Sequence, residues 1–167
     1  MKLEMYMVKR LQNLIGVCKY CNPKRNNVMM ECLKLYLLQG NYMEAEEICN
    51  NMDTDSIRDM VMTIAYDIEN ICVYSFIRYM IERTKNVGWI ELAIDVMLHP
   101  LCFVEGAYSV ALFHARELLL TNKSVENLER ILFFYNLPEK LVEKKEAQCL
   151  AKEILKVEPD NEIALEI

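Results

Sequence analysis

Two cysteines separated by two residues, Cys18 and Cys21, are the pair in this chain best spaced for metal or redox chemistry. A structural zinc site needs four ligands, and no second Cys pair or spaced His pair lies nearby. Cys32 and Cys49 would complete the set only if the fold brought them close. A redox motif needs its thiols at a helix N-terminus, whereas this pair falls near the expected end of a helix. We therefore expect two ordinary helix-end cysteines, and neither a metal nor a cofactor.

A histidine–carboxylate cluster is the second candidate for chemistry. Asp95 and His99 lie four residues apart and so share one helical face, and His114 falls on the arm expected to pack against it. Together they could supply a general base or an ion ligand, which would make the protein a helical enzyme. No motif places a nucleophile beside them, and the chain has no Gly-rich phosphate loop, Gly-x-Ser-x-Gly or His-Glu-x-x-His pattern. Helix-surface pairs of this kind are usually structural, so we expect no enzyme.

Carboxylates are densest between residues 44 and 59. This stretch holds six acidic residues and a single basic residue, Arg58. Such a run is most often a solvated face. The functional interpretation is a docking surface for a basic partner, and the residues assigned to it are Glu44, Glu47, Asp53, Asp55 and Asp59.

The net charge is −6, but it is unevenly distributed. Residues 1–27 carry six basic side chains against one acidic, whereas residues 28–60 carry seven acidic against two basic. An acidic protein lacks the basic surface that displaces counterions from nucleic acid. We therefore expect no nucleic-acid partner, and a protein partner that is basic.

Composition favours one helical domain over residues 1–167. Hydrophobic residues make up 53% of the chain while Gly and Pro number only 4 each, a balance typical of long helices with short connections. There is no apolar run of 18 residues, and charges fall where a signal peptide would need its apolar core. Seven cysteines without framework spacing suit a reducing compartment. We expect a cytoplasmic protein without a membrane segment.

Apolar residues recur at steps of three and four through most of the chain, which predicts helices rather than strands. Gly40 suits the left-handed residue that closes one helix, and Asn22-Pro23 and Leu137-Pro138 mark further turns. Asp53 and Ser124 are among the side chains placed to cap helix N-termini. About nine helices are predicted, over residues 2–20, 28–39, 42–52, 53–66, 68–85, 89–98, 104–120, 124–134 and 139–157, followed by a short piece to residue 167.

A pattern that begins at Gly40 recurs along the chain. The glycine is followed two residues later by tyrosine and three residues after that by alanine, and apolar positions continue at helical spacing. A second full copy begins at Gly106, and weaker copies begin at Cys72 and Val142. By subtraction, the four starts are 32, 34 and 36 residues apart, which is close to the length of a two-helix repeat.

This pattern resembles the tetratricopeptide repeat family, whose units carry Gly, Tyr and Ala at this spacing and a closing Pro. The family's first-helix positions are mostly not met, so the resemblance is to a divergent array of this kind or a HEAT-like one. It implies antiparallel helical hairpins stacked as a short right-handed α-solenoid. The residues that carry the resemblance most clearly are Gly40, Tyr42, Ala45, Ala147, Ala151 and Pro159.

Helical repeats without a catalytic motif favour a protein–protein interaction module. In size, acidity and lack of catalytic signature, the chain is similar as a class to immunity proteins of bacterial toxin systems, which often neutralise basic toxins. The leading hypothesis is therefore an acidic inhibitor that binds and neutralises a basic toxin. The alternatives are a peptide-sensing or regulatory tetratricopeptide-like adaptor, and the helical enzyme that uses Asp95, His99 and His114.

Overall fold

The computed structural model describes residues 23–167, with side chains from residue 27 onward. This part of the chain is all-α, with nine helices and no strand, which confirms the predicted fold class. The helix predicted over residues 2–20, with Cys18 and Cys21, lies outside the described residues. The helices are α2 (Pro23–Gln39), α3 (Tyr42–Cys49), α4 (Thr54–Ile68), α5 (Cys72–Thr84), α6 (Val87–Leu98), α7 (Ala107–Thr121), α8 (Val125–Asn136), α9 (Lys144–Val157) and α10 (Glu162–Leu165).

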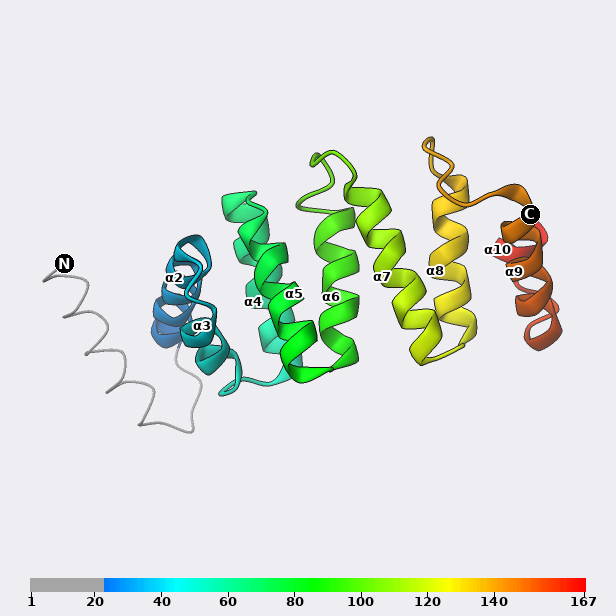
Figure 1. Ribbon diagram of the computed structural model, residues 1–167. Coiled ribbons are helices and arrows are strands. Elements are labelled where there is room, and N and C mark those ends of the chain that lie inside the picture. The colour runs from blue at the N-terminus through cyan, green and yellow to red at the C-terminus, as the bar shows by residue number, and fades with distance from the viewer. Residues whose placement is uncertain (1–22) are drawn as a thin grey trace, which may run out of the picture.

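The helices follow one another in a row, with α2 and α3 at one end and α9 and α10 at the other (Figure 1). Contacts and ion pairs also link helices that are two apart in the chain: α2 contacts α4, α4 contacts α6, α3 contacts α5 and α8 contacts α10. Two layers result. The first layer holds α2, α4, α6, α8 and α10, and the second layer holds α3, α5, α7 and α9.

Charged side chains join successive helices within each layer. Most of these side chains are at least partly exposed, so the pairs contribute little to stability, and burial of apolar surface between the layers is the larger source. The ion pairs are Lys34–Asp67, Arg58–Asp95 and Arg130–Glu91 in the first layer, and Arg83–Glu46, Arg78–Glu117 and Arg116–Glu146 in the second.

Each of the four starts of the sequence pattern lies within two residues of the start of a second-layer helix. Residues 40, 72, 106 and 142 stand at or just before the first residues of α3, α5, α7 and α9. The residue five positions after each start is 0% exposed, and three of the four are alanines, which let neighbouring helices approach closely. These residues are Ala45, Ile77, Ala111 and Ala147. The right-handed solenoid and the single domain over residues 1–167 stay predictions.

The helix ends follow local chemistry that the sequence announces. Gly40 takes the left-handed conformation, with φ of 72°, and the chain turns there from α2 into α3. Asp53 caps α4 by accepting a hydrogen bond from the backbone N–H of Ser56 at 2.9 Å. Ser124 caps α8 in the same way, accepting from the N–H of Asn127 at 3.3 Å. These turn and cap predictions are confirmed.

Two predicted helix boundaries are wrong. Helix α2 begins at Pro23 rather than near Val28, because proline lacks an N–H and its fixed φ suits the first position of a helix. Helix α9 begins at Lys144 rather than near Glu139, because Lys140 takes a left-handed conformation, with φ of 45°, that a right-handed helix does not include. Residues 137–143 are therefore a connection.

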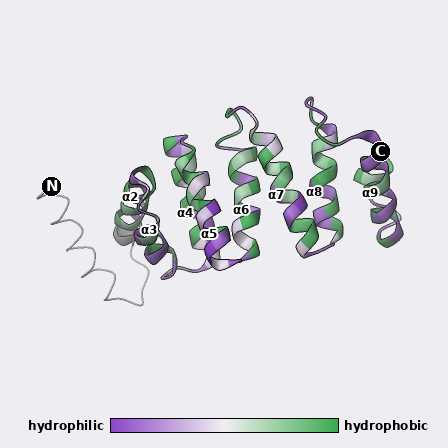
Figure 2. Cartoon of the chain, in the orientation of Figure 1, coloured by the Kyte–Doolittle hydropathy of each residue, from purple (hydrophilic) through white to green (hydrophobic). Residues whose placement is uncertain are grey.

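Apolar side chains fill the space between the layers. Phe76 of α5 and Phe134 of α8 are 0% exposed. Helix α6 lies in the middle of the row and carries six buried residues, whereas α9 at the end carries three. Figure 2 accordingly shows α6 largely green and α9 with much purple. None of the described helices is long and apolar enough to cross a membrane.

Candidate functional site

All five carboxylates of the predicted docking surface are exposed. Glu44 and Glu47 lie on α3, Asp53 precedes α4, and Asp55 and Asp59 lie on its first two turns. None of the five forms an ion pair with a described residue. We call this set the acidic surface.

Two carboxylates of the same stretch serve the fold instead. Glu46 accepts a hydrogen bond from the hydroxyl of Tyr79 at 2.7 Å and pairs with Arg83 at 3.4 Å, so it ties α3 to α5. Asp53 accepts hydrogen bonds from the backbone N–H and the hydroxyl of Ser56, which lower the pKa of its carboxyl. The carboxylates left with no described side-chain partner are Glu44, Glu47, Asp55 and Asp59.

A pocket of about 390 Å³ lies where the N-terminal parts of α4, α6 and α8 meet. We call it the α4–α6–α8 pocket. Its volume lies in the range of cavities that hold small molecules or parts of a peptide. Asp55 belongs both to this pocket and to the acidic surface. The charged and aromatic side chains that line the pocket are Asp55, Arg58, Trp89, Glu91, Glu126 and Arg130.

The charges around the pocket are unevenly paired. Arg58 pairs with Asp95, which comes from α6. Arg130 pairs with Glu126 at 2.6 Å and lies 4.0 Å from Glu91, while its Nε is buried and has no acceptor. Both arginines are therefore matched by a carboxylate, whereas the ion pair of Glu91 with Arg130 is long, at 4.0 Å, and shares that arginine with Glu126.

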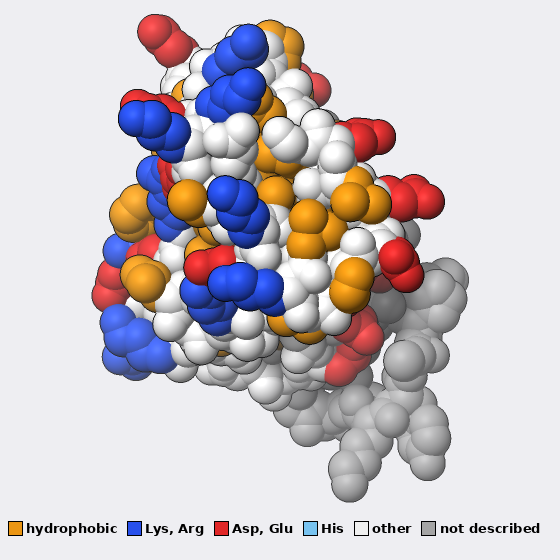
Figure 3. Space-filling view, turned by 90° about the vertical axis from the view of Figure 1, so that its right-hand side faces the viewer, with side chains coloured by type: hydrophobic (Ala, Val, Ile, Leu, Met, Phe, Trp, Pro, Cys, Tyr) orange, Lys and Arg blue, Asp and Glu red, His pale blue; other side chains and the backbone are white. Residues whose placement is uncertain are grey.

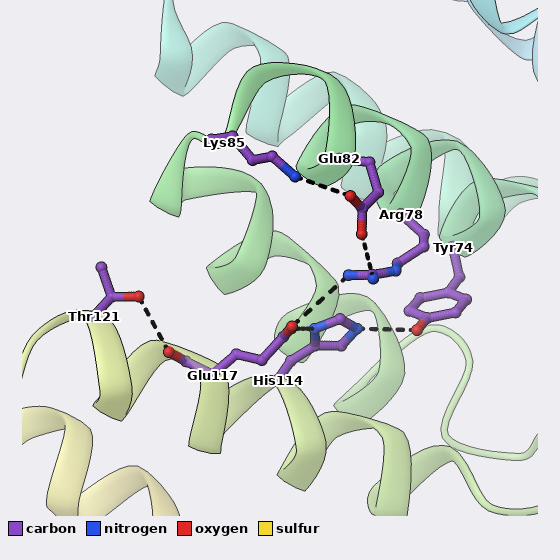
Figure 4. Close-up of polar contacts among 7 residues, drawn as sticks. All are labelled: Tyr74, Arg78, Glu82, Lys85, His114, Glu117 and Thr121. Carbon is purple, nitrogen blue, oxygen red and sulfur yellow. Dashed lines mark hydrogen bonds and ion pairs between the residues drawn. The ribbon is translucent and has the colours of Figure 1, made fainter.

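A buried histidine joins α5 to α7 (Figure 4). His114 is 0% exposed, its Nε2 lies 2.9 Å from the hydroxyl of Tyr74, and its Nδ1 lies 2.7 Å from a carboxylate oxygen of Glu117. Since an ionised carboxylate only accepts, Nδ1 donates to Glu117 and Nε2 accepts from Tyr74. Burial lowers the pKa of His114, although Glu117 acts in the opposite direction. The imidazole is therefore neutral at neutral pH, with both ring nitrogens hydrogen-bonded.

Charged residues continue from this histidine along α5. Arg78 lies 3.9 Å from Glu117 and also pairs with Glu82, which in turn pairs with Lys85 at 2.9 Å (Figure 4). Burial is the main cause that raises the pKa of Tyr74, so its hydroxyl stays protonated. A phenol that resists ionisation suits a structural hydrogen bond better than a nucleophile. We therefore interpret the cluster as a polar contact that stabilises the packing of α5 against α7.

The predicted trio of Asp95, His99 and His114 does not form a hydrogen-bonded group. Asp95 pairs within the first layer with Arg58, and His114 pairs within the second layer with Tyr74. His99 is exposed at the end of α6, and its backbone N–H, not its side chain, is hydrogen-bonded to Asp95, through the carbonyl at 3.0 Å. The structure therefore gives each of the two paired residues a different partner.

Sequence reasoning missed Tyr74 and Glu117 as the partners of His114. Glu117 lies three residues after His114, a spacing that makes two helical residues neighbours. His114 also lies eight residues after the start of its repeat copy, where the two preceding copies bury Ile48 and Met80. A histidine at a position that is otherwise apolar indicates a buried polar group with partners, and this was the available signal.

The α9 end of the row carries unpaired positive charge. Viewed from that end, Lys and Arg side chains run from the top through the middle and along the left of the face, where some acidic side chains also lie, whereas the right-hand edge carries only acidic ones among the charged groups (Figure 3). Both glutamates of α9 are engaged, Glu146 with Arg116 and Glu153 with Lys123. The lysines of α9 are exposed and form no ion pair with a described residue; they are Lys144, Lys145, Lys152 and Lys156.

The structure shows no metal-binding cluster within residues 27–167. No three His, Cys, Asp or Glu side chains of that part are grouped so as to hold a metal. Cys18 and Cys21 lie outside it, so their predicted lack of metal stays a prediction. The five cysteines in that part are free thiols, and burial raises the pKa of Cys49 to about 12, which keeps it un-ionised at neutral pH.

No protein-family model, curated protein or solved structure matches this chain. Residues 23–167 form an all-helical fold with an exposed acidic surface and a polar pocket. The resemblances to tetratricopeptide repeats and to immunity proteins accordingly stay proposals.

Proposed function

We propose that this protein is a non-enzymatic binding protein whose acidic surface engages a basic protein partner, in the manner of an immunity-type inhibitor. The observation that carries the proposal is the free charge of that surface, since all five carboxylates are exposed and four have no described side-chain partner. Carboxylates that serve the fold, such as Glu46, are paired instead. Exposed and unpaired charges speed and orient the encounter with an oppositely charged protein.

The distribution of charge along the row supports a directed encounter. The negative charge of α3 acts on Tyr36 of α2. Burial is the main cause that raises the pKa of Tyr36, and the charges of Cys32, Glu44 and Glu47 raise it further. At the other end of the row, the four lysines of α9 have no described partner. A basic partner is therefore attracted to α3 and α4 and repelled from α9.

Charge reversal on α4 tests this proposal. The double substitution Asp55→Lys with Asp59→Lys is expected to slow association with the basic partner by about tenfold or more at low salt, because exposed charges steer the encounter. The difference in association rate should shrink as salt rises, because charges more than roughly 10 Å apart are already largely screened at 0.1 M ionic strength. Association rates measured across a salt series, with circular dichroism to check that the helices persist, provide the test.

A matched control changes the net charge equally at another place. Glu139 and Glu143 are exposed, lie in the connection before α9 and form no ion pair with a described residue. Reversal of both to lysine is expected to leave the association rate within about threefold of wild type, since those charges lie away from α3 and α4. Equal rates and equal salt slopes for wild type and the α4 variant would mean that the acidic surface is only solvated.

The regulatory adaptor is the second candidate function. It draws support from the α4–α6–α8 pocket, whose size suits part of a peptide. The adaptor would bind a short peptide without inhibiting a toxin, so loss of a toxin's activity on binding separates the two. The enzyme candidate lacks a comparable observation, because Asp95 and His114 have separate partners.

A further inference from the structure

The α4–α6–α8 pocket contains polar groups that the fold leaves unused. Asp55 has no described side-chain partner, and the nearest cation to Glu91 is Arg130 at 4.0 Å. The Nε of Arg130 is buried and has no acceptor. Because this atom is buried, it cannot reach an acceptor on a bound segment, so the groups of the pocket that can recognise a ligand are its carboxylates. The same lining therefore offers two carboxylates to a cation.

Helix dipoles account for only part of this negative lining. The N-termini of α4, α6 and α8 carry partial positive charge, and Asp55 and Glu126 lie in the first turns of α4 and α8, where they offset it. Glu91 lies in the second turn of α6, beyond the range in which that charge is strong. It also precedes Asp95 by four residues, so two like charges lie on the same side of α6. Glu91 is therefore a carboxylate that the dipole does not explain and that only the long ion pair with Arg130 engages.

We infer that the α4–α6–α8 pocket binds an extended peptide segment that carries an arginine or lysine side chain. The cation lies between the carboxylates of Asp55 and Glu91. Trp89 and Leu92, which also line the pocket, provide an apolar wall for the methylene stem of the basic side chain. The inference rests on the proposed function, since it makes this segment part of the basic partner.

The only tryptophan of the chain lines the pocket, so its fluorescence reports on occupancy. The probe is a short blocked peptide of Gly and Ser residues with two arginines, titrated into the full-length protein at low salt, and matched peptides carry glutamine or glutamate at those positions. The arginine peptide is expected to give a saturable change and to bind at least about tenfold more tightly than the glutamine peptide. The glutamate peptide is expected not to bind.

Two neutral variants keep the shape of the pocket and remove its charge. Asp55→Asn and Glu91→Gln are each expected to weaken binding of the arginine peptide by about tenfold. The control pair, Glu44→Gln with Glu47→Gln, removes charge from α3 outside the pocket and is expected to change binding by less than about twofold. Equal binding of the glutamate peptide, or no effect of Glu91→Gln, would overturn the inference.

Failure of the pocket and failure of the proposed function give different results. Suppose that association with a basic protein slows on reversal of Asp55 and Asp59 but does not change with Glu91→Gln. This result would rule out peptide binding in the pocket and would leave the proposed function unaffected. Suppose instead that the arginine peptide binds selectively but the reversal of Asp55 and Asp59 changes association with no basic protein. This result would support the pocket as a peptide site and would rule out the proposed inhibitor function.

Discussion

Replacement of Phe76 by alanine is expected to lower the free energy of unfolding by about 3–5 kcal/mol. The ring is 0% exposed on α5, and its centroid lies 5.7 Å from those of Tyr42 on α3 and Trp89 on α6. Its removal leaves a cavity among three helices of both layers and also takes away the aromatic support behind Trp89. Urea denaturation followed by circular dichroism measures the loss.

Phe103 provides the matched control for this substitution. It lies in the connection between α6 and α7 and is 62% exposed. The same change there, Phe103→Ala, is expected to alter the free energy of unfolding by no more than about 0.5 kcal/mol, because little buried contact is lost. Similar losses for the two variants would contradict the packing of α5 between α3 and α6.

His114→Met is expected to lower stability by about 1–3 kcal/mol at pH 8, because the hydroxyl of Tyr74 loses its acceptor. This difference should narrow as the pH falls. Burial lowers the pKa of His114 below its ordinary value of 6.5, so between those values the unfolded chain binds a proton that the folded protein does not. The contribution of His114 is thus complete above pH 6.5 and declines toward the lowered pKa. Denaturation midpoints at several pH values from 8 to 5 measure it.

Two charged side chains near His114 also affect its pKa. Arg78 from α5 favours the neutral imidazole, whereas Glu117 on α7 favours the protonated form and only partly offsets burial. The chain has just two histidines, so His99→Gln is a clean control. His99 is exposed, and the variant should keep the wild-type slope. A gap between wild type and His114→Met that stays constant from pH 8 to 5 would contradict the buried, neutral histidine.

Much of the fold could be predicted because its signals are local. The step of three and four among apolar residues indicates helices, and Gly40 and Asp53 mark a turn and a cap through their own backbone and side-chain chemistry. The end of α5 could also be predicted, because the basic Lys85 suits a helix C-terminus. The end of α4 carries no such signal, since Glu69 takes a left-handed conformation there, with φ of 45°, although most side chains disfavour that region.

The candidate sites could be predicted only in part, because they depend on contacts between distant segments. Local charge density identified the exposed carboxylates, but it could not show that Glu46 turns toward Tyr79 on α5. The α4–α6–α8 pocket joins three segments, residues 54–58, 86–92 and 126–130, that are at least 28 residues apart in the chain, by subtraction. Likewise, His114 meets Tyr74 across 40 residues, a pairing that no local spacing reveals.

The most direct test of whether the acidic surface binds a basic protein is capture of the partner from the native host. Wild type and the Asp55→Lys, Asp59→Lys variant are immobilised and compared side by side. Mass spectrometry and staining identify and quantify what each retains. We predict that wild type retains one basic protein at low salt, in an amount near-equal to its own, and that the variant retains much less of it. Wild type should release the protein toward about 1 M salt, where charges more than roughly 3 Å apart are screened. Equal retention of the same protein by both at every salt concentration, or capture of no basic protein, would contradict the proposed function.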